Sequence, residues 1–283
     1  MYTEISFPSL GIAIDPPSYI TLGPLTIHFY GVIIAVGLLL AVLYACKRSK
    51  EFGIKEDDLL DGVLWVTPFA IICARLYYCI FSWEHYADNP VSILYIWEGG
   101  LAIYGGVIGA ALGIIVFSKI KKISLGALLD VVSIGFLIGQ SIGRWGNFMN
   151  REAFGAPTES FLRMGLLNKL TEQVEYYHPT FLYESVWNAV GFVALHFLSK
   201  RRRYDGQIAL CYAAWYGLGR TFIEGLRTDS LYWGPFRVSQ MLAAVSCFAA
   251  VVALLVLSFK HHDPAAMQVN RVAAEANTEA EEA

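Results

Sequence analysis

The chain has 283 residues, of which 56% are hydrophobic and only 16% are charged, and its formal net charge at pH 7 is −3. This composition is more apolar than that of soluble domains, so it excludes an ordinary water-soluble protein. The slightly negative charge gives no reason to expect a nucleic-acid partner.

Long apolar segments indicate that the chain crosses a bilayer several times. A helix needs roughly 17–25 mostly apolar residues to cross the hydrocarbon core. The segments that meet this requirement are 27–46, 60–81, 100–118, 125–143, 181–199, 207–224 and 237–259. They predict an all-α, polytopic integral membrane protein with about seven transmembrane helices. Because Arg75 and Glu224 fall inside apolar windows, six or eight helices also fit the pattern.

The distribution of lysine and arginine predicts the orientation of the chain. These residues are missing from positions 1–29 and 82–100, and they gather after the first, third and fifth spans, at Lys47, Arg48, Lys50, Lys119, Lys121, Lys122, Lys200, Arg201, Arg202 and Arg203. By the positive-inside rule, the N-terminus is expected outside and the C-terminus in the cytoplasm. Long loops obey this rule weakly, so the segment 144–180 is predicted to be a small extracytoplasmic subdomain.

The two ends of the chain carry different signals. The N-terminal residues lack the basic start and apolar stretch of a cleavable signal peptide, so the first helix is expected to be retained. Residues 1–260 are expected to form one membrane-embedded domain. Residues 261–283 are short of aromatic residues and carry several glutamates, which predicts a disordered acidic cytoplasmic tail without a catalytic role.

Glycines recur every four residues in two of the predicted spans. They are Gly105, Gly109 and Gly113 in the third span and Gly135, Gly139 and Gly143 in the fourth. Small residues at this spacing let helix backbones approach closely in lipid, so both helices are predicted to pack through these faces. A phosphate-binding loop is not expected, because no GxGxxG or Walker pattern follows a strand.

The five cysteines lie in or at the ends of apolar spans, without a CxxC pair or a histidine cluster at zinc spacing. They are interpreted as small packing residues. No metal ion and no organic cofactor is expected.

Charged residues at the outer ends of two predicted spans form the candidate site. Arg144, Asn147 and Glu152 follow the fourth span, while Arg220 and Glu224 lie four residues apart on one face of the sixth. The second pair alone is compatible with a structural ion pair. Because both spans end on the same side, all five side chains can converge in a polar pocket at the outer leaflet. Arginine offers a planar fork of donors to phosphate oxygens, so an anionic lipid headgroup is the expected ligand.

Three further polar residues in the spans also have structural explanations. Arg75 can extend toward the interface or make a structural ion pair. Tyr30 and Tyr104 lie at outer ends of spans, where tyrosine commonly belongs to the aromatic belt.

Several segments resemble, in the same order, those of a known family of bacterial inner-membrane enzymes. They are HFYG (28–31), EGGLAIYGG (98–106), GRWGNFMNREAFG (143–155), HPTFLYE (178–184), YGLGR (216–220) followed by Glu224, and RVSQ (237–240). Together they span residues 28–240, and the long segment 143–155 is the most specific. In these motifs the chain is similar to the prolipoprotein diacylglyceryl transferases.

The resemblance implies transfer of the diacylglyceryl group of phosphatidylglycerol to the thiol of the lipobox cysteine in a prolipoprotein. The products are a thioether and glycerol 1-phosphate, and the reaction is the first step of bacterial lipoprotein maturation. The resemblance also implies an active site on the extracytoplasmic side of the inner membrane.

Four charged motif residues are expected to serve this reaction. Arg144 and Arg220 are expected to stabilise the charge that grows on the departing phosphate. Glu152 and Glu224 are expected to orient these arginines, and either could instead accept the proton of the substrate thiol.

The remaining motif residues are expected to bind substrate or shape the backbone. Asn147 can bond the glycerol hydroxyls or the phosphate, and Tyr30, Tyr104 and Tyr216 can donate to phosphate oxygens or simply pack. Gly155 is expected to permit a turn or a close backbone approach that a side chain would block.

Two positions depart from the family pattern. Tyr104 stands where many members have histidine, so an imidazole base is not expected there and the identity of the general base stays open. Phe181 stands where glutamine is common, which suggests different packing or headgroup contacts.

Two other functional classes compete with an enzyme. A transporter or channel would line its path with the intramembrane charges, but the sequence has no evident internal repeat and no paired interrupted spans. A structural scaffold would explain the glycine ladders but would leave the intramembrane arginines without a purpose.

Overall fold

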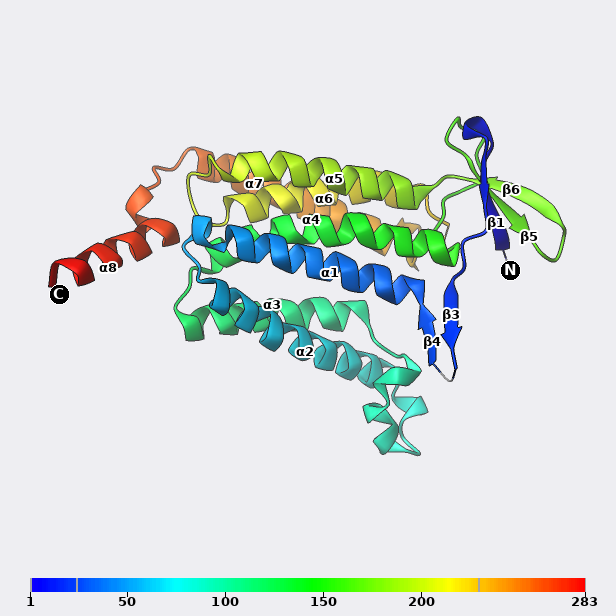
Figure 1. Cartoon of the computed structure of the whole chain (residues 1–283), viewed down its shortest axis with the longest axis horizontal. Coiled ribbons are helices and arrows are strands. Elements are labelled where there is room, and N and C mark those ends of the chain that lie inside the picture. The colour runs from blue at the N-terminus through cyan, green and yellow to red at the C-terminus, as the bar shows by residue number, and fades with distance from the viewer. Residues whose placement is uncertain (1, 24, 229, 283) are drawn as a thin grey trace. The chain divides into compact units, whose positions relative to one another are not determined.

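The computed structural model describes residues 2–23, 25–228 and 230–282, and the chain divides into two compact units. The first unit comprises Met1–Tyr44, Val132–Arg203 and Gln207–His262. The second comprises Ala45–Val131, Tyr204–Gly206 and Asp263–Ala283. Figure 1 labels the elements of both units.

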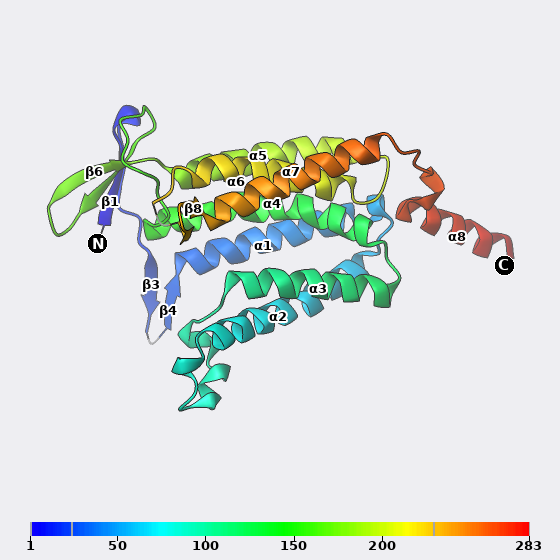
Figure 2. The same cartoon turned by 180° about the vertical axis from the view of Figure 1, so that it is seen from behind.

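Helices dominate the first unit. They are α1 (Phe29–Arg48), α4 (Leu125–Asn150), α5 (Thr180–Ser199), α6 (Gln207–Glu224) and α7 (Val238–Ser258), of which α1 and α4 continue into the second unit. Helix α6 packs against both α5 and α7, as Figure 2 shows. Large apolar side chains such as Phe222, Val245 and Phe248 are exposed on these helices. An apolar surface of this kind is expected for helices in contact with lipid. A helix can lie there because it satisfies its own backbone hydrogen bonds.

The glycine ladder of α4 packs against α1, as its spacing predicts. A methyl group added to Gly135 would lie 3.2 Å from the carbonyl oxygen of Ala41, and one added to Gly143 would lie 3.1 Å from Ile34. The two backbones therefore approach at a distance that larger side chains would prevent.

In the second unit, α2 (Glu56–Phe81) and α3 (Ile103–Lys121) pack along each other. A methyl group added to Gly109 would lie only 2.5 Å from Cβ of Cys73, and one added to Gly105 would lie 2.4 Å from Cβ of Tyr77. The predicted packing role of this second ladder is confirmed.

Arg75 of α2 has a structural role in the second unit. Arg75 is only 5% exposed. Its guanidinium group donates hydrogen bonds to the carbonyl oxygens of Ser92, Ile93, Tyr95, Gly99 and Gly100. These acceptors belong to the connection that carries the short 3₁₀ helices η3 (Trp83–His85), η4 (Pro90–Leu94) and η5 (Ile96–Glu98). Arg75 therefore fixes the path of the chain between α2 and α3.

Within the described residues, six helices are long and apolar enough to cross a membrane: α1 with the adjoining 3₁₀ helix η2 (Ser49–Phe52), α2, α3, α4, α5 and α7. Helix α6 has the predicted bounds 207–224 but is not among them. Its 18 residues include Arg220 and Glu224, which lower its mean hydropathy. The chain is thus an α-helical, polytopic membrane protein, and the expected number of seven spans is not confirmed.

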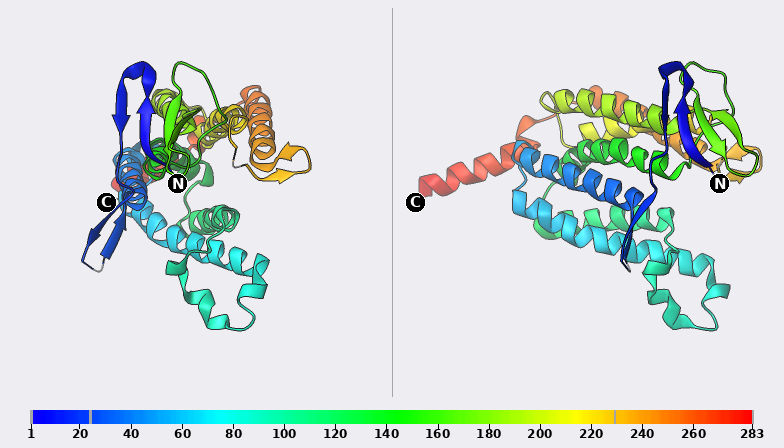
Figure 3. Two further views of the ribbon diagram at one scale, coloured as in Figure 1. Left: turned by 90° about the vertical axis from the view of Figure 1, so that its right-hand side faces the viewer. Right: turned by 45° about the vertical axis from the view of Figure 1, so that its right-hand side comes forward.

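A small antiparallel sheet, which the sequence does not reveal, accompanies the helices of the first unit. Its strand order is β2-β1-β5-β6, with bounds β1 (Tyr2–Phe7), β2 (Ile12–Ile14), β5 (Met164–Asn168) and β6 (Gln173–Tyr177). The segment 144–180, predicted to form a subdomain, therefore pairs with the N-terminus of the chain; in Figure 3 the blue β1 lies beside the green β5. Ile5, Met164 and Leu166 form a core with Phe148 and Phe181, which attaches the sheet to α4 and α5.

Two hairpins complete the first unit. Strands β3 (Tyr19–Leu22) and β4 (Leu25–His28) precede α1, and strands β7 (Tyr232–Trp233) and β8 (Phe236–Arg237) precede α7. Arg237 donates to the carbonyl oxygens of Gly225 and Arg227, so the second hairpin is tied to the end of α6.

The C-terminal segment differs from the disordered tail that its composition predicts. After the 3₁₀ helix η6 (Pro264–Ala266), residues Gln268–Glu282 form helix α8. The backbone N–H of buried Gln268 donates to Asp205, and its side-chain oxygen accepts from the backbone N–H of Ser124. These contacts hold the start of an alanine- and glutamate-rich segment whose residues favour helix, a local preference that the compositional argument overlooked.

Candidate functional site

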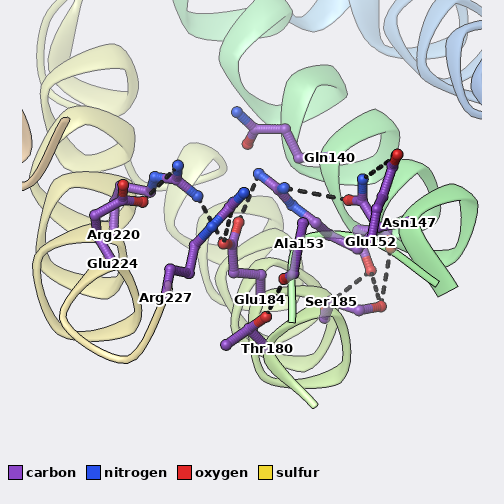
Figure 4. A network of polar contacts seen from close by, with 12 residues as sticks. Gln140, Asn147, Glu152, Ala153, Thr180, Glu184, Ser185, Arg220, Glu224 and Arg227 are labelled. Atoms are coloured by element: carbon purple, nitrogen blue, oxygen red, sulfur yellow. Dashed lines mark hydrogen bonds and ion pairs between the residues drawn. The ribbon is translucent and has the colours of Figure 1, made fainter. Parts of the chain in front are cut away.

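Two arginines from separate helices meet on one carboxylate in the first unit. Glu184 lies on the second turn of α5. Its Oε2 atom is 2.6 Å from Nη2 of Arg144 on α4. Its other oxygen, Oε1, lies 2.7 Å from Nη1 of Arg220 on α6 and 3.9 Å from Nη1 of Arg227. Figure 4 shows Glu184, Arg220 and Arg227 converging between the helices.

Glu224 extends the group along α6. It pairs with Arg220 one turn earlier, with 2.6 Å between Oε2 and Nη2, and its Oε1 accepts from the hydroxyl of Ser230 at 2.9 Å. Its side chain is only 2% exposed. Arg144, Glu184, Arg220, Glu224 and Arg227 are called the arginine cluster below.

Asn147 connects Arg144 to Glu152 at the end of α4. Its Oδ1 accepts from Nη1 of Arg144 at 3.4 Å, and its Nδ2 donates to Oε1 of Glu152 at 3.0 Å. Asn150 also donates to Glu152, at 3.4 Å. Of the two glutamates expected to orient arginines, Glu224 therefore contacts one directly, whereas exposed Glu152 reaches Arg144 through Asn147.

Gly155 makes the close backbone approach that was expected there. Its N–H donates to the carbonyl oxygen of His178, and a short β-bridge joins it to Arg227. A methyl group added to Gly155 would lie 2.9 Å from the carbonyl oxygen of Leu226 and 2.7 Å from Cβ of His178. The glycine thus lets the chain after α4 lie against the residues that carry Arg227.

Two of the three candidate tyrosines belong to the same unit as the arginine cluster. Tyr30, at the start of α1, packs on Gly146, whose added methyl group would lie 2.7 Å from the Tyr30 ring. Tyr216 stacks on Tyr212 with 5.7 Å between ring centroids, and the hydroxyl of Tyr212 accepts from Nε2 of Gln140 at 2.9 Å. Tyr104 lies in the first turn of α3, in the second unit.

The charges of the arginine cluster favour an anionic ligand. The cluster contains three guanidinium groups and two carboxylates, so with all of them ionised it keeps one positive charge. A guanidinium group carries five N–H donors, more than the contacts to Glu184 and Glu224 use. Among the described residues, no three His, Cys, Asp or Glu side chains come together as metal ligands would.

Comparison with known proteins assigns this arrangement to a family. A profile of the prolipoprotein diacylglyceryl transferases matches residues 17–256, which include the whole arginine cluster. The chain belongs to the prolipoprotein diacylglyceryl transferase family. The sequence resemblance is thereby confirmed, and with the spans described above the chain is a multi-pass membrane transferase of this family.

Individual relatives extend over most of the chain. A phosphatidylglycerol–prolipoprotein diacylglyceryl transferase of Listeria welshimeri is 42% identical over 267 residues, covering 92% of this chain and 96% of its own. Proteins of the same name from Limosilactobacillus reuteri and Lactiplantibacillus plantarum are both 44% identical, over 247 and 258 residues. The matched regions cover 84% and 88% of this chain, respectively, and 90% of the length of each relative.

Sequence reasoning did not single out three polar residues in or near the arginine cluster. Glu184 is the last residue of the family-like motif 178–184. The feature that could have identified it from the sequence is a carboxylate inside an apolar span. Arg227 lies three residues after Glu224, beyond the end of α6, and nothing local distinguishes it. Gln140 precedes Arg144 by one helical turn, and its Oε1 is buried without a hydrogen-bond partner.

The two departures from the family pattern occupy different surroundings. Phe181 is 5% exposed and packs on Trp145 and Phe148, with ring centroids 5.4 and 4.8 Å away. It thus contributes to packing at the base of the sheet. Tyr104 is 38% exposed in the first turn of α3.

Proposed function

We propose that this protein transfers the diacylglyceryl group of phosphatidylglycerol to the lipobox cysteine thiol of prolipoproteins. The products are a thioether-linked lipid and glycerol 1-phosphate, which makes this the first step of lipoprotein maturation. Family membership supports the proposal, as do relatives named for this lipid and this protein substrate.

The observation that carries the proposal is the meeting of Arg144, Arg220 and Arg227 around Glu184. With Glu224 counted as well, the arginine cluster keeps one positive charge in excess. The phosphodiester of phosphatidylglycerol carries one negative charge, which this excess would balance. Arginine's planar fork matches two phosphate oxygens at once and stays charged at any physiological pH.

In the proposed reaction, the substrate thiol loses its proton, and its sulfur attacks the glyceryl carbon that bears the phosphate. The carbon–oxygen bond breaks, and the electron pair leaves with glycerol 1-phosphate, so negative charge grows on the phosphate oxygens. Arg144 and Arg220 stabilise this charge more in the transition state than in the bound lipid. No metal ion, organic cofactor or enzyme cysteine takes part.

The other motif residues bind and orient in this proposal. Asn147 and Tyr216 contact the headgroup, Tyr30 and Tyr104 donate to phosphate oxygens, and Gly155 provides backbone space. Glu224 orients Arg220, and Glu152 acts on Arg144 through Asn147.

We also propose that the protein lies in the bacterial inner membrane with the arginine cluster on the extracytoplasmic side. The N-terminus would then be outside and the C-terminus cytoplasmic, as the placement of lysine and arginine favours. The thiol of a prolipoprotein signal peptide and the lipid would meet at the outer leaflet.

Replacement of the forked donors tests the proposal. Arg144→Lys and Arg220→Lys keep the charge but lose the fork, so thioether formation on a lipobox peptide is expected to fall about 100- to 1000-fold in kcat. The assay uses proteoliposomes with labelled phosphatidylglycerol and also measures released glycerol phosphate.

Arg163→Lys is the matched control. Arg163 lies over the Tyr176 ring in the sheet subdomain, which comprises residues 144–180 with strands β1 and β2, and it is not a member of the arginine cluster. Full activity of both Arg144→Lys and Arg220→Lys would contradict the assignment of these donors. Wild-type protein that moves solute or lipid without releasing glycerol phosphate would instead place the chain among transporters.

A further inference from the structure

The contacts of Glu184 differ from those of Glu224, the other carboxylate of the arginine cluster. Each of its carboxylate oxygens forms an ion pair with a different arginine, one on α4 and one on α6, and its side chain is 5% exposed. Glu224, in contrast, pairs with Arg220 on its own helix and with Ser230. Glu184 is thus the carboxylate that bridges guanidinium groups of separate helices. Figure 4 shows it beside Arg220 and Arg227.

Contacts other than those of this carboxylate also join the helices. Helix α5 is joined to α4 by hydrogen bonds in which Ser185 and Ser141 each donate to the other's carbonyl oxygen. It is joined to α6 by Trp187 and Trp215, which stack at 4.4 Å and donate from each indole N–H to the other's carbonyl oxygen. A buried charge is costly, and these contacts also join the helices, so its presence calls for another explanation.

We propose that Glu184 is a positioning residue that serves as the internal counter-ion of Arg144 and Arg220 and competes with the lipid phosphate for them. This inference rests on the proposed function. In the absence of lipid, the carboxylate pairs with both arginines, offsets one of their two positive charges and holds them at a fixed separation. When the phosphate binds, it must share or displace guanidinium donors that Glu184 already uses.

This competition has two opposite kinetic consequences. Binding of the ground-state lipid is weakened, because part of its binding energy is spent against the existing ion pairs. The chemical step is favoured, because both donors stay aligned as charge grows on the phosphate, and misalignment by about 1 Å can cost about 100-fold. Removal of the charge is therefore expected to lower KM and kcat together, as expected when an interaction that opposes ground-state binding is lost.

The test compares Glu184→Gln with Glu184→Asp in proteoliposomes that contain phosphatidylglycerol. Glu184→Gln is nearly isosteric and neutral, and we expect kcat to fall about 100-fold while KM for the lipid falls several-fold. Glu184→Asp keeps the charge on a shorter side chain, and we expect it to recover at least part of kcat and to restore KM. Exposed Glu159→Gln, in the sheet subdomain, is the matched control and is expected to leave both constants unchanged.

Equilibrium binding without peptide substrate gives a readout that a packing defect would not reproduce. Glu184→Gln is expected to bind phosphatidylglycerol more tightly than wild type, with no gain for zwitterionic phosphatidylcholine. Weaker or unchanged binding of phosphatidylglycerol, or an unchanged kcat, would overturn the proposal. Tighter binding in Glu184→Gln together with a wild type that forms no thioether would sink the proposed reaction but keep the counter-ion role.

Discussion

In the proposed reaction, single residues of the arginine cluster meet two requirements at once. A charge inside a membrane helix needs a partner, and the substrate phosphate needs free donors. Arg144 and Arg220 satisfy the first through Glu184 and keep further N–H groups for the second. Arg75 satisfies only the first, since its donors all point at carbonyl oxygens of one connection. Residue type alone does not separate these two uses of arginine, whereas the identity of the acceptors does.

Tyr104 carries a prediction at this scale, because the sequence resemblance leads us to expect histidine at this position. If its hydroxyl donates to the lipid phosphate, Tyr104→Phe is expected to lower kcat/KM for thioether formation about 10-fold, the usual effect of losing one neutral hydrogen bond. Tyr95→Phe, in the same unit, serves as control and is expected to retain full activity. Equal activity of Tyr104→Phe and wild type would reduce Tyr104 to a residue of the aromatic belt.

At the level of secondary-structure elements, different interactions hold the helices together and hold the sheet together. Helices α2 and α3 pack through glycines at which even a methyl group would clash. The sheet instead depends on a small apolar core and on a polar group formed by Glu175 with two tyrosines. Tyr177 and Tyr2 both donate their hydroxyl hydrogens to Oε2 of Glu175, at 2.5 and 2.9 Å, which ties β1 to β6 across β5.

This group predicts how the stability of the sheet changes with pH. Hydrogen bonds from Tyr177 and Tyr2 lower the pKa of Glu175 below its ordinary value of 4.5. The folded sheet then binds fewer protons than the unfolded chain just below that value, so the stabilisation is complete above about pH 4.5 and is lost as pH falls through the lowered pKa.

Hydrogen exchange of the β5–β6 segment between pH 6 and pH 3, corrected for intrinsic rates, measures this effect. Its opening free energy is expected to fall with acid in wild type and to fall less in Glu175→Gln. Identical acid dependence in the two proteins would contradict the role given to Glu175.

For the whole molecule, the decisive property is orientation in the bilayer. The basic connections after the first, third and fifth spans favour a cytoplasmic location, and the sheet subdomain is then extracytoplasmic. In a cysteine-free background, a cysteine at Glu159 is expected to react with an impermeant maleimide in intact spheroplasts. A cysteine at Arg201 is expected to react only after lysis, and the reverse pattern would place the arginine cluster on the cytoplasmic side.

The sequence by itself determined the membrane helices, the two glycine ladders and the family. A helix in lipid must satisfy its own backbone, so each span is encoded locally by a run of apolar residues, and even α6 begins and ends where the pattern predicts. For the tail, composition predicts disorder, and residues Gln268–Glu282 of that segment form α8.

Only the tertiary structure decided what joins distant segments. The pairing of β1 with β5 and the two ion pairs of Glu184 link residues far apart in the chain, and no local pattern encodes such contacts. Arg144 and Arg220 could be chosen from the sequence as charges in apolar spans. That they share one buried carboxylate depends on how α4, α5 and α6 pack, because a long-range ion pair exists only where packing brings its partners within reach.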